Sequence, residues 1–171
     1  MEYTYTYKSD VYCGCPETIT PESYYKKHVY EVCEVLLDGY GFEKMKANLL
    51  CTDNYYTSLP LSDLCERNQI SLIGTVKSNR KGFDKKMLDV RDRSVNSSIV
   101  WFEKTNKTKS ITSTCVQTSK GKKALLIFSS YKGLSTLGVS TDEKKKTALN
   151  RVYNYCKIGT DVSGKNKVMI L

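Results

Sequence analysis

The apolar residues of this chain come in short runs of strand length. The longest strongly hydrophobic stretch is Ala124 to Phe128, whereas a membrane-spanning helix needs roughly 20 apolar residues. Between such runs, apolar residues recur at helical spacing, as in Leu61, Leu64 and Cys65. Strand-sized runs that alternate with amphipathic helices predict a mixed α/β layer in which helices pack against a sheet.

Along the chain these patterns run strand, helix, strand, helix, strand up to about residue 76. The expected strands are 3–7, 47–51 and 70–76, and the expected helices follow Thr20 and Ser58, which are suited to N-caps. Beyond Lys77, basic loops alternate with β-prone runs at 99–102, 110–116 and 124–129. Residues 147–156 fit either a strand or a helix, and a last helix is expected to begin within the terminal segment 159–171.

The chain of 171 residues has the length of one domain with its own core. We expect a single domain over residues 1–171, with a basic β-rich insertion at about 78–146. The N-terminus lacks the basic start and apolar middle of a signal peptide, which predicts an intracellular protein without a membrane segment. Seven cysteines are an odd and scattered set, so we expect reduced, packed thiols. A zinc site at Cys13, Cys15 and His28 is the less favoured alternative, because their spacing fits no usual pattern.

Charge divides the chain into two unlike halves. Residues 1–76 hold 6 basic and 11 acidic side chains, a net charge of −5, and residues 77–171 hold 21 and 7, a net charge of +14. A basic half of this size is typical of a protein that meets polyanions, although a solvated lysine-rich surface is the alternative. The basic clusters are Lys77/Arg80/Lys81, Lys85/Lys86, Lys120/Lys122/Lys123 and 144–146.

Asp53 directly follows the expected strand at 47–51. The carboxyl edge of a strand in an α/β fold is where loops present chemistry on a rigid sheet, and a carboxylate there suits Mg²⁺. One aspartate does not make a two-metal site, which needs further acidic side chains from other elements. Taken alone, Asp53 is also consistent with a turn or helix-capping residue.

Three segments of the chain resemble, in order, three blocks of the piggyBac transposase family. They are CTDNYYTSLPL at 51–61, ISLIGTVKSNRKG at 70–82 and YNYCKIGTDVSGK at 153–165. The first two blocks are specific, and the third departs from the family's Lys-Gly-Gly-Val-Asp at Ile158 and Thr160. The resemblance extends from about residue 45 to residue 165.

This resemblance implies an RNase H-like α/β fold, with a mixed sheet, flanking helices and a β-rich insertion. Family members cut and join DNA with carboxylates that hold two divalent metal ions. By the match, Asp53 is the second of these carboxylates and Asp161 the third. The implied cofactor is Mg²⁺ or Mn²⁺, the implied partner is DNA, and the implied location is the nucleus if the protein is functional.

The family pattern is incomplete in this sequence. Gly164 stands where the family has a further aspartate, and the opening carboxylate aligns at or before Met1. We therefore expect a truncated catalytic domain without its first strand, with weak or absent metal binding and no activity. Glu2 or Asp10 would be the substitutes for the opening carboxylate, but a one-residue shift on a strand turns a side chain to the opposite face.

Three interpretations of function follow. The first is a DDE-type strand-transfer domain by descent, inactive as this chain. The second is a non-catalytic nucleic-acid-binding module in which the clusters Lys77/Arg80/Lys81 and Lys120/Lys122/Lys123 contact phosphates and Trp101 stacks on a base. The third is a transposon relic without a selected role.

Overall fold

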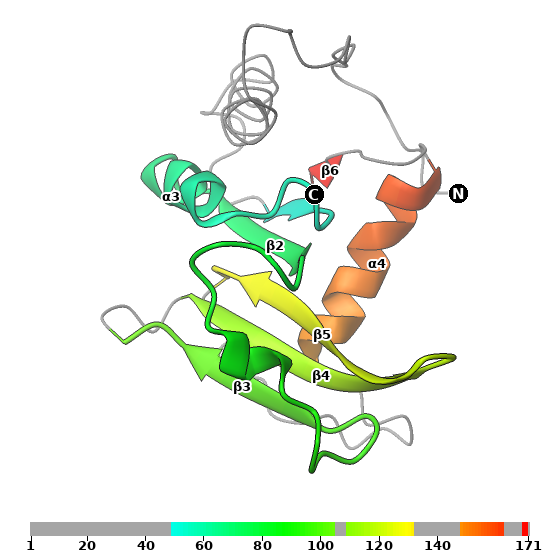
Figure 1. The fold of residues 1–171 in the computed structure, drawn as a ribbon. Helices are drawn as coiled ribbons and strands as arrows, with labels where there is room; N and C mark the ends of the chain where they lie inside the picture. The colour runs from blue at the N-terminus through cyan, green and yellow to red at the C-terminus, as the bar shows by residue number, and fades with distance from the viewer. Residues whose placement is uncertain (1–48, 105–108, 132–147, 163–168, 171) are drawn as a thin grey trace, which may run out of the picture.

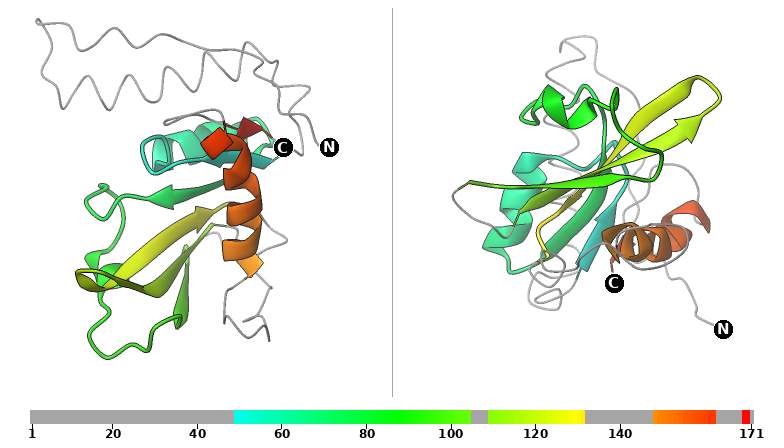
Figure 2. Two further views of the ribbon diagram at one scale, coloured as in Figure 1. Left: turned by 90° about the vertical axis from the view of Figure 1, so that its right-hand side faces the viewer. Right: turned by 90° about the horizontal axis from the view of Figure 1, so that it is seen from below.

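The computed structural model describes residues 49–104, 109–131, 148–162 and 169–170. The strand and helix expected before residue 49, the zinc alternative, and Glu2, Asp10 and Gly164 lie outside these residues. Within them the chain forms a sheet with one helix on each face (Figures 1 and 2). The prediction of a mixed α/β layer is confirmed.

The sheet has six strands in the order β3-β4-β5-β2-β1-β6 among the described residues. The strands are β1 (Leu49–Thr52), β2 (Ser71–Val76), β3 (Ser98–Phe102), β4 (Ser110–Thr118), β5 (Gly121–Ser129) and β6 (Met169–Ile170). Strands β1 and β2 run parallel, with Leu50 opposite Leu72, and the other described pairs are antiparallel. The β-prone runs after Lys77 thus continue the sheet outward from β2, through the pairing of β2 with β5. The boundaries of an insertion at 78–146 stay a prediction.

Successive side chains of the central strands point to opposite faces of the sheet, so the core consists of two clusters, one on each face. On one face, α3 (Leu59–Arg67) covers Leu50, Leu72 and Phe128. On the other, α4 (Ala148–Val162) covers Cys51, Ile73 and Ile127. Because neighbouring residues of a strand point to opposite faces, these central strands must be apolar at nearly every position, which explains their continuous hydrophobic runs.

Helix α3 begins as the sequence predicts. The Ser58 hydroxyl accepts a hydrogen bond from the Leu61 backbone N–H at 3.3 Å, and Pro60 occupies the first turn, where no intrahelical N–H bond is lost. Leu61, Leu64 and Cys65 are buried in the first cluster. The cap and the apolar stripe are both local features, so this helix could be recognised without tertiary information.

Residues 148–162 form a helix, which resolves the strand-or-helix alternative. Leu149, Tyr153 and Cys156 lie on one stripe at helical spacing and are buried against the sheet. Polar side chains also join this helix to the sheet. The Asn150 side-chain amide donates to Thr114 Oγ1 at 3.1 Å, and the Tyr153 and Thr75 hydroxyls are hydrogen-bonded at 3.2 Å.

The expectation of a last helix near the C-terminus is wrong for the residues described there. Met169 and Ile170 form β6, which pairs antiparallel with β1, so that Ile170 lies opposite Leu50. The free edge of β1 offers backbone groups that a strand can satisfy and a helix cannot. That edge is created by tertiary folding and is not visible in the local sequence.

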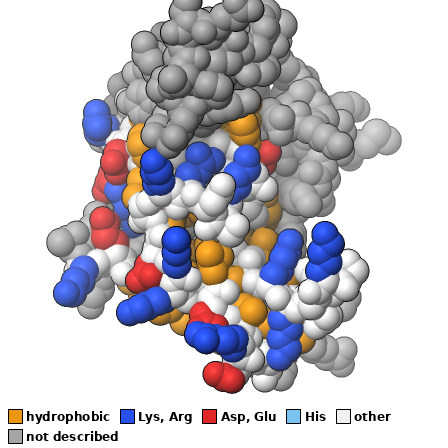
Figure 3. All heavy atoms as spheres, in the orientation of Figure 1, with side chains coloured by type: hydrophobic (Ala, Val, Ile, Leu, Met, Phe, Trp, Pro, Cys, Tyr) orange, Lys and Arg blue, Asp and Glu red, His pale blue; other side chains and the backbone are white. Residues whose placement is uncertain are grey.

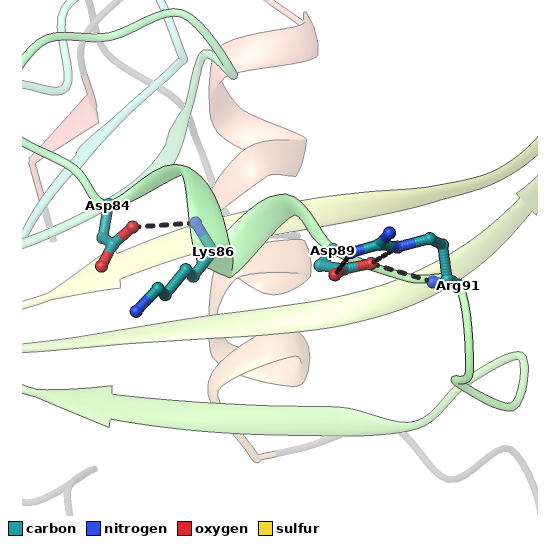
Figure 4. A network of polar contacts seen from close by, with 4 residues as sticks. All are labelled: Asp84, Lys86, Asp89 and Arg91. Atoms are coloured by element: carbon teal, nitrogen blue, oxygen red, sulfur yellow. Dashed lines mark hydrogen bonds and ion pairs between the residues drawn. The ribbon is translucent and has the colours of Figure 1, made fainter.

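The segment between β2 and β3 crosses the sheet on the side of α3 and contains a short 3₁₀ helix, η1 (Lys85–Leu88). Asp84 Oδ1 caps this helix by accepting from the Lys86 N–H at 2.9 Å (Figure 4). Asp89 binds the Arg91 guanidinium through both carboxylate oxygens, at 3.1 and 2.6 Å, and the Arg91 side-chain and backbone hydrogen bonds lower the pKa of Asp89 to about 2.

Arg93 attaches the same segment to β4. Its guanidinium donates to Ser113 Oγ at 2.8 Å and to the carbonyl oxygens of Ser97 and Ser113. Ser113 Oγ in turn donates to the Met87 carbonyl at 2.7 Å. At Ser113, β4 is therefore covered by polar contacts with the segment between β2 and β3 rather than by apolar side chains.

Lys109 joins the start of β4 to α3. Its ammonium group lies 2.7 Å from Asp63 Oδ1 and 2.9 Å from Glu66 Oε2, and its side chain is only 12% exposed. Burial acts to lower the pKa of Lys109, but the hydrogen bonds and charges of Asp63 and Glu66 outweigh it and raise the pKa above its ordinary value of 10.5. The two ion pairs therefore stabilise the charged form of Lys109 in the folded state.

Replacing Lys109 by Met should lower the free energy of unfolding by about 1 kcal/mol at neutral pH, because both ion pairs are removed while the apolar stem is kept. Since the folded pKa is raised, the contribution should be fully present below pH 10.5 and should disappear as the pH rises through the folded value. Urea unfolding of the wild type and Lys109→Met at pH 7 and above pH 10.5 measures this. The exposed Lys85→Met is the matched control, and an equal destabilisation in that variant would contradict the assignment.

Candidate functional site

Asp53 lies one residue beyond the C-terminal end of β1 and is half-buried. Its Oδ1 atom accepts hydrogen bonds from the backbone N–H groups of Tyr55 at 2.8 Å and Tyr56 at 3.3 Å. Its carbonyl oxygen accepts from the Thr57 N–H at 3.1 Å. The carboxylate thus organises the loop 53–57, as the turn interpretation predicts, and the loop in return fixes the orientation of the carboxylate.

Thr57 anchors the far end of this loop on the sheet. Its side chain is fully buried, and its hydroxyl donates to the Asp53 carbonyl at 2.7 Å and lies 2.8 Å from Thr52 Oγ1. Because the Thr57 proton is directed to the Asp53 carbonyl, the hydrogen bond between the two hydroxyls is donated by Thr52.

Gly74 on β2 makes room for these two threonines. A Cβ atom at Gly74 would lie 2.5 Å from Thr52 Oγ1 and 2.7 Å from the Thr52 carbonyl oxygen, and closer still to Thr57 Oγ1. Real Cβ atoms do not approach other atoms so closely. Because Gly74 has no side chain, the loop 53–57 can pack closely against the parallel strands β1 and β2.

Arg80, from the loop after β2, also stabilises the loop 53–57. Its Nη2 atom donates to the carbonyl oxygens of Asn54 at 2.9 Å and Tyr55 at 2.5 Å. Burial lowers the pKa of Arg80, and the nearby Asp53 carboxylate partly opposes that shift. Sequence analysis proposed Arg80 for phosphate contact, whereas in this structure these donors are engaged inside the chain.

Lys77 also belongs to this site. Its ammonium group lies 5.0 Å from the centre of the Tyr55 ring, within the range of a cation–π interaction. The Tyr55 and Tyr56 rings meet edge to face with centroids 5.1 Å apart. Lys77 and Lys81 are both exposed, so the first basic cluster borders the loop that carries Asp53.

The second candidate residue, Asp161, belongs to helix α4. Asp161 lies on this helix five residues after Cys156, which belongs to the same core cluster as Cys51 on β1, two residues before Asp53. Five residues of helix correspond to about 7.5 Å along its axis. The side chain of Asp161 lies outside what the structure describes.

Asp53 fits the requirements of one ligand to a divalent ion. Two backbone N–H groups of the loop hold Oδ1, and no hydrogen bond from another described residue reaches Oδ2. Hard oxygen ligands of this kind suit Mg²⁺ and Mn²⁺. Among the described side chains, no three of His, Cys, Asp or Glu gather into a metal-binding group.

The third cluster of basic residues, Lys120, Lys122 and Lys123, lies at the tip of the β4–β5 hairpin, remote in sequence and in the sheet from Asp53. The hairpin extends beyond the rest of the sheet in Figures 1 and 2. All three lysines are exposed, although Lys122 Nζ also donates to the Arg93 carbonyl at 2.8 Å. Figure 3 shows Lys and Arg side chains spread over the described part of the face in view, with Asp and Glu among them.

Sequence analysis missed the structural roles of Thr57 and Gly74. The sequence did contain a signal for Gly74, because an isolated glycine within a strand pattern indicates that another part of the chain approaches closely. The partner of Gly74 was not predictable from that signal, since Thr57 meets it only after β1 and β2 pair in their parallel register.

The sequence matches a known protein family over most of its length. The family model described as Transposase IS4 matches residues 1–166. The chain belongs to this transposase family. No curated protein gives a significant match.

The fold of this IS4-family chain is similar to that of the piggyBac transposase in the cryo-EM structure of its synaptic complex with hairpin DNA. The TM-score is 0.61 at 22% sequence identity, over 79% of this chain and 26% of the other. The chain thus spans about a quarter of the length of that protein. The predicted resemblance to piggyBac-type transposases and the RNase H-like fold class are confirmed. None of the described helices is both long and apolar enough to cross a membrane.

Replacing Gly74 by Ala should destabilise the protein by about 3 kcal/mol, because the added methyl group overlaps Thr52 and Thr57. In the Gly74→Ala background, Thr57→Ala removes one of the overlapping hydroxyls and should cost less than it does in the wild type. Urea unfolding of the four proteins of this double-mutant cycle measures the coupling. Strictly additive effects would show that Thr57 does not pack on Gly74.

Proposed function

We propose that this chain is a transposase-derived catalytic domain of the DDE type, in which Asp53 and Asp161 are two of the metal-binding carboxylates. The observation that carries the proposal is the Asp53 carboxylate itself. It lies at the carboxyl edge of β1 in a chain of the transposase family, with Oδ1 held by two backbone N–H groups. The family resemblance supplies Asp161 as its partner on α4.

A divalent ion, when bound, would activate water and stabilise the leaving oxygen in phosphoryl transfer. The residues of this chain serve that chemistry by positioning. Thr57 and Gly74 hold the loop against β2, and Arg80 holds two of its carbonyl oxygens. Asp53 is thereby held on a rigid support, which matters because a misplacement of about 1 Å costs roughly 100-fold in rate.

Two carboxylates form an incomplete cage, because Mg²⁺ normally also takes substrate phosphates and water as ligands. Gly164, at the position where related transposases carry a further aspartate, contributes no side-chain ligand. The proposal therefore includes weak metal binding and no DNA cleavage by residues 1–171 alone.

Isothermal calorimetry with Mn²⁺ should detect weak binding that Asp53→Ala removes, because only one of the two carboxylates remains. Asp63→Ala, which removes a carboxylate on α3, is the matched control and should leave the binding unchanged. Tight, stoichiometric binding of two ions would contradict the incomplete ligand set. Mg²⁺-dependent nicking of DNA that Asp53→Asn abolishes would contradict the absence of activity.

We further propose that the basic half of the chain binds DNA, which is also the function of the non-catalytic alternative. The β4–β5 hairpin favours it, since Lys120 and Lys123 are exposed, whereas the exposed Lys122 also donates to the Arg93 carbonyl oxygen. Arg80, Arg91 and Lys109 contribute less, because their charged groups are engaged within the chain. Trp101 is half-buried on the edge strand β3, so base stacking would use only its exposed part.

Duplex DNA should bind without sequence preference and with an affinity that falls as salt rises. Changing Lys120, Lys122 and Lys123 together to Ala should reduce the slope of log K against log salt by about 0.9 for each phosphate that the variant no longer neutralises. Fluorescence anisotropy at several salt concentrations measures the slope.

The matched control changes three other exposed lysines, Lys85, Lys86 and Lys104, to Ala. It removes the same charge from other parts of the surface. An equal change in slope would assign binding to total charge rather than to the hairpin. Absence of binding at low salt would contradict DNA binding and favour a relic.

A further inference from the structure

Strand β3 forms one edge of the described sheet and exposes apolar side chains there. It pairs with β4 on one side, and none of the other described strands lies on its other side (Figure 1). Ile99, Val100 and Phe102 are 44%, 42% and 46% exposed. Natural edge strands commonly carry charged residues or proline that prevent further pairing, and the sequence SIVWF of β3 has neither.

The pairing of β3 with β4 determines which backbone groups of β3 face the open edge. The Glu103 N–H donates to the Lys109 carbonyl at 3.0 Å, so the backbone of Glu103 bonds toward β4. Because this direction alternates along an antiparallel strand, Ile99 and Trp101 also bond toward β4. The N–H and C=O groups that point toward the open edge therefore belong to Ser98, Val100 and Phe102.

We propose that the open edge of β3 pairs antiparallel with β3 of a second copy of this chain, about a two-fold axis at Val100. In this register Val100 lies opposite Val100 of the second copy, and Ser98 lies opposite Phe102. These residues carry the outward backbone groups, so about six hydrogen bonds join the two strands. The register pairs all five residues of β3, whereas any other register leaves some of them unpaired.

The side chains on one face of the sheet fit the same axis. Ile99 of each copy lies opposite Trp101 of the other, on the face that carries Ser113 of β4. Aliphatic and aromatic side chains stabilise a sheet when they face each other across two strands. The exposed Ile99 side chains are therefore covered when the second copy binds.

Charge is complementary at both ends of the paired strands. The exposed Glu103 of one copy lies opposite Ser97 of the other. The Arg93 guanidinium binds Ser97, with Nε 3.4 Å from its Oγ and Nη2 2.9 Å from its carbonyl oxygen. Each Glu103 carboxylate thus approaches a guanidinium, and no like charges within residues 97–103 face each other. Such self-complementarity is what a two-fold interface requires, and it favours a second copy over an unrelated strand.

The interface is small, so the dimer is weak. Pairing through five residues buries less than the roughly 800 Å² per partner of a stable complex. The net charge of +9 on each copy also opposes association at low salt. We expect a dissociation constant on the order of 100 μM. The pairing is independent of whether Asp53 binds metal and of whether the β4–β5 hairpin binds DNA.

Sedimentation equilibrium of the full chain from about 10 μM to 1 mM should show a reversible equilibrium of monomer and dimer. Amide hydrogen exchange, followed by NMR at both ends of this range, should locate the interface. Within β3, added protection at high concentration should concentrate on Ser98, Val100 and Phe102, because the Ile99 and Trp101 amides already bond to β4. A monomer at every concentration, assemblies larger than a dimer, or a dimer that leaves these three amides unprotected would overturn the proposal.

Two substitutions at Val100 test the axis itself. Val100→Pro removes an N–H that faces outward, so it leaves the bonds to β4 in place and should abolish the dimer. Val100→Lys keeps the N–H but places like charges face to face, and it should raise the dissociation constant at least about tenfold.

Tyr155→Lys is the matched control, because it replaces another exposed apolar side chain, on α4, and adds the same charge. It should leave the dissociation constant unchanged. Equal dimerisation of the wild type and Val100→Lys would overturn the proposal, even if Val100→Pro does not fold.

Discussion

The arrangement around Asp53 depends on a missing side chain. Gly74 leaves a space on β2 that Thr52 and Thr57 fill, and this contact holds the loop after β1 down against the sheet. The loop then turns directly into α3, whose cap residue Ser58 follows Thr57. One steric condition therefore sets the direction of the carboxylate and the start of the helix that covers the first core cluster.

The second support of the architecture is helix α4, which lies across the opposite face. Its buried stripe packs on the central strands, and its polar contacts reach Thr114 on β4 and Thr75 on β2. These hydrogen bonds are directional, so they define where along the sheet the helix lies, while the apolar contacts supply most of its stabilisation.

Charge has two different uses in the basic half. Arg80, Arg93 and Lys109 hold loops and helices in place through carbonyl oxygens or carboxylates. The hairpin lysines remain exposed to solvent. Net charge alone therefore overestimates the number of side chains available to a polyanion, because a guanidinium that already donates to backbone carbonyls must give up those bonds to contact a phosphate.

The sequence by itself determined the family and the types of the elements between residues 49 and 129. Apolar runs predicted the central strands, the Ser58 cap and the stripe at Leu61 and Leu64 predicted α3, and the three sequence blocks led to the transposase family. All of these are local signals. Only the tertiary structure decided that residues 148–162 form a helix, that residues 169–170 pair with β1, and that Arg80 and Thr57 hold the Asp53 loop. Each of these depends on groups brought together from distant parts of the chain, such as the free edge of β1 or the space at Gly74, and these exist only once the sheet has formed.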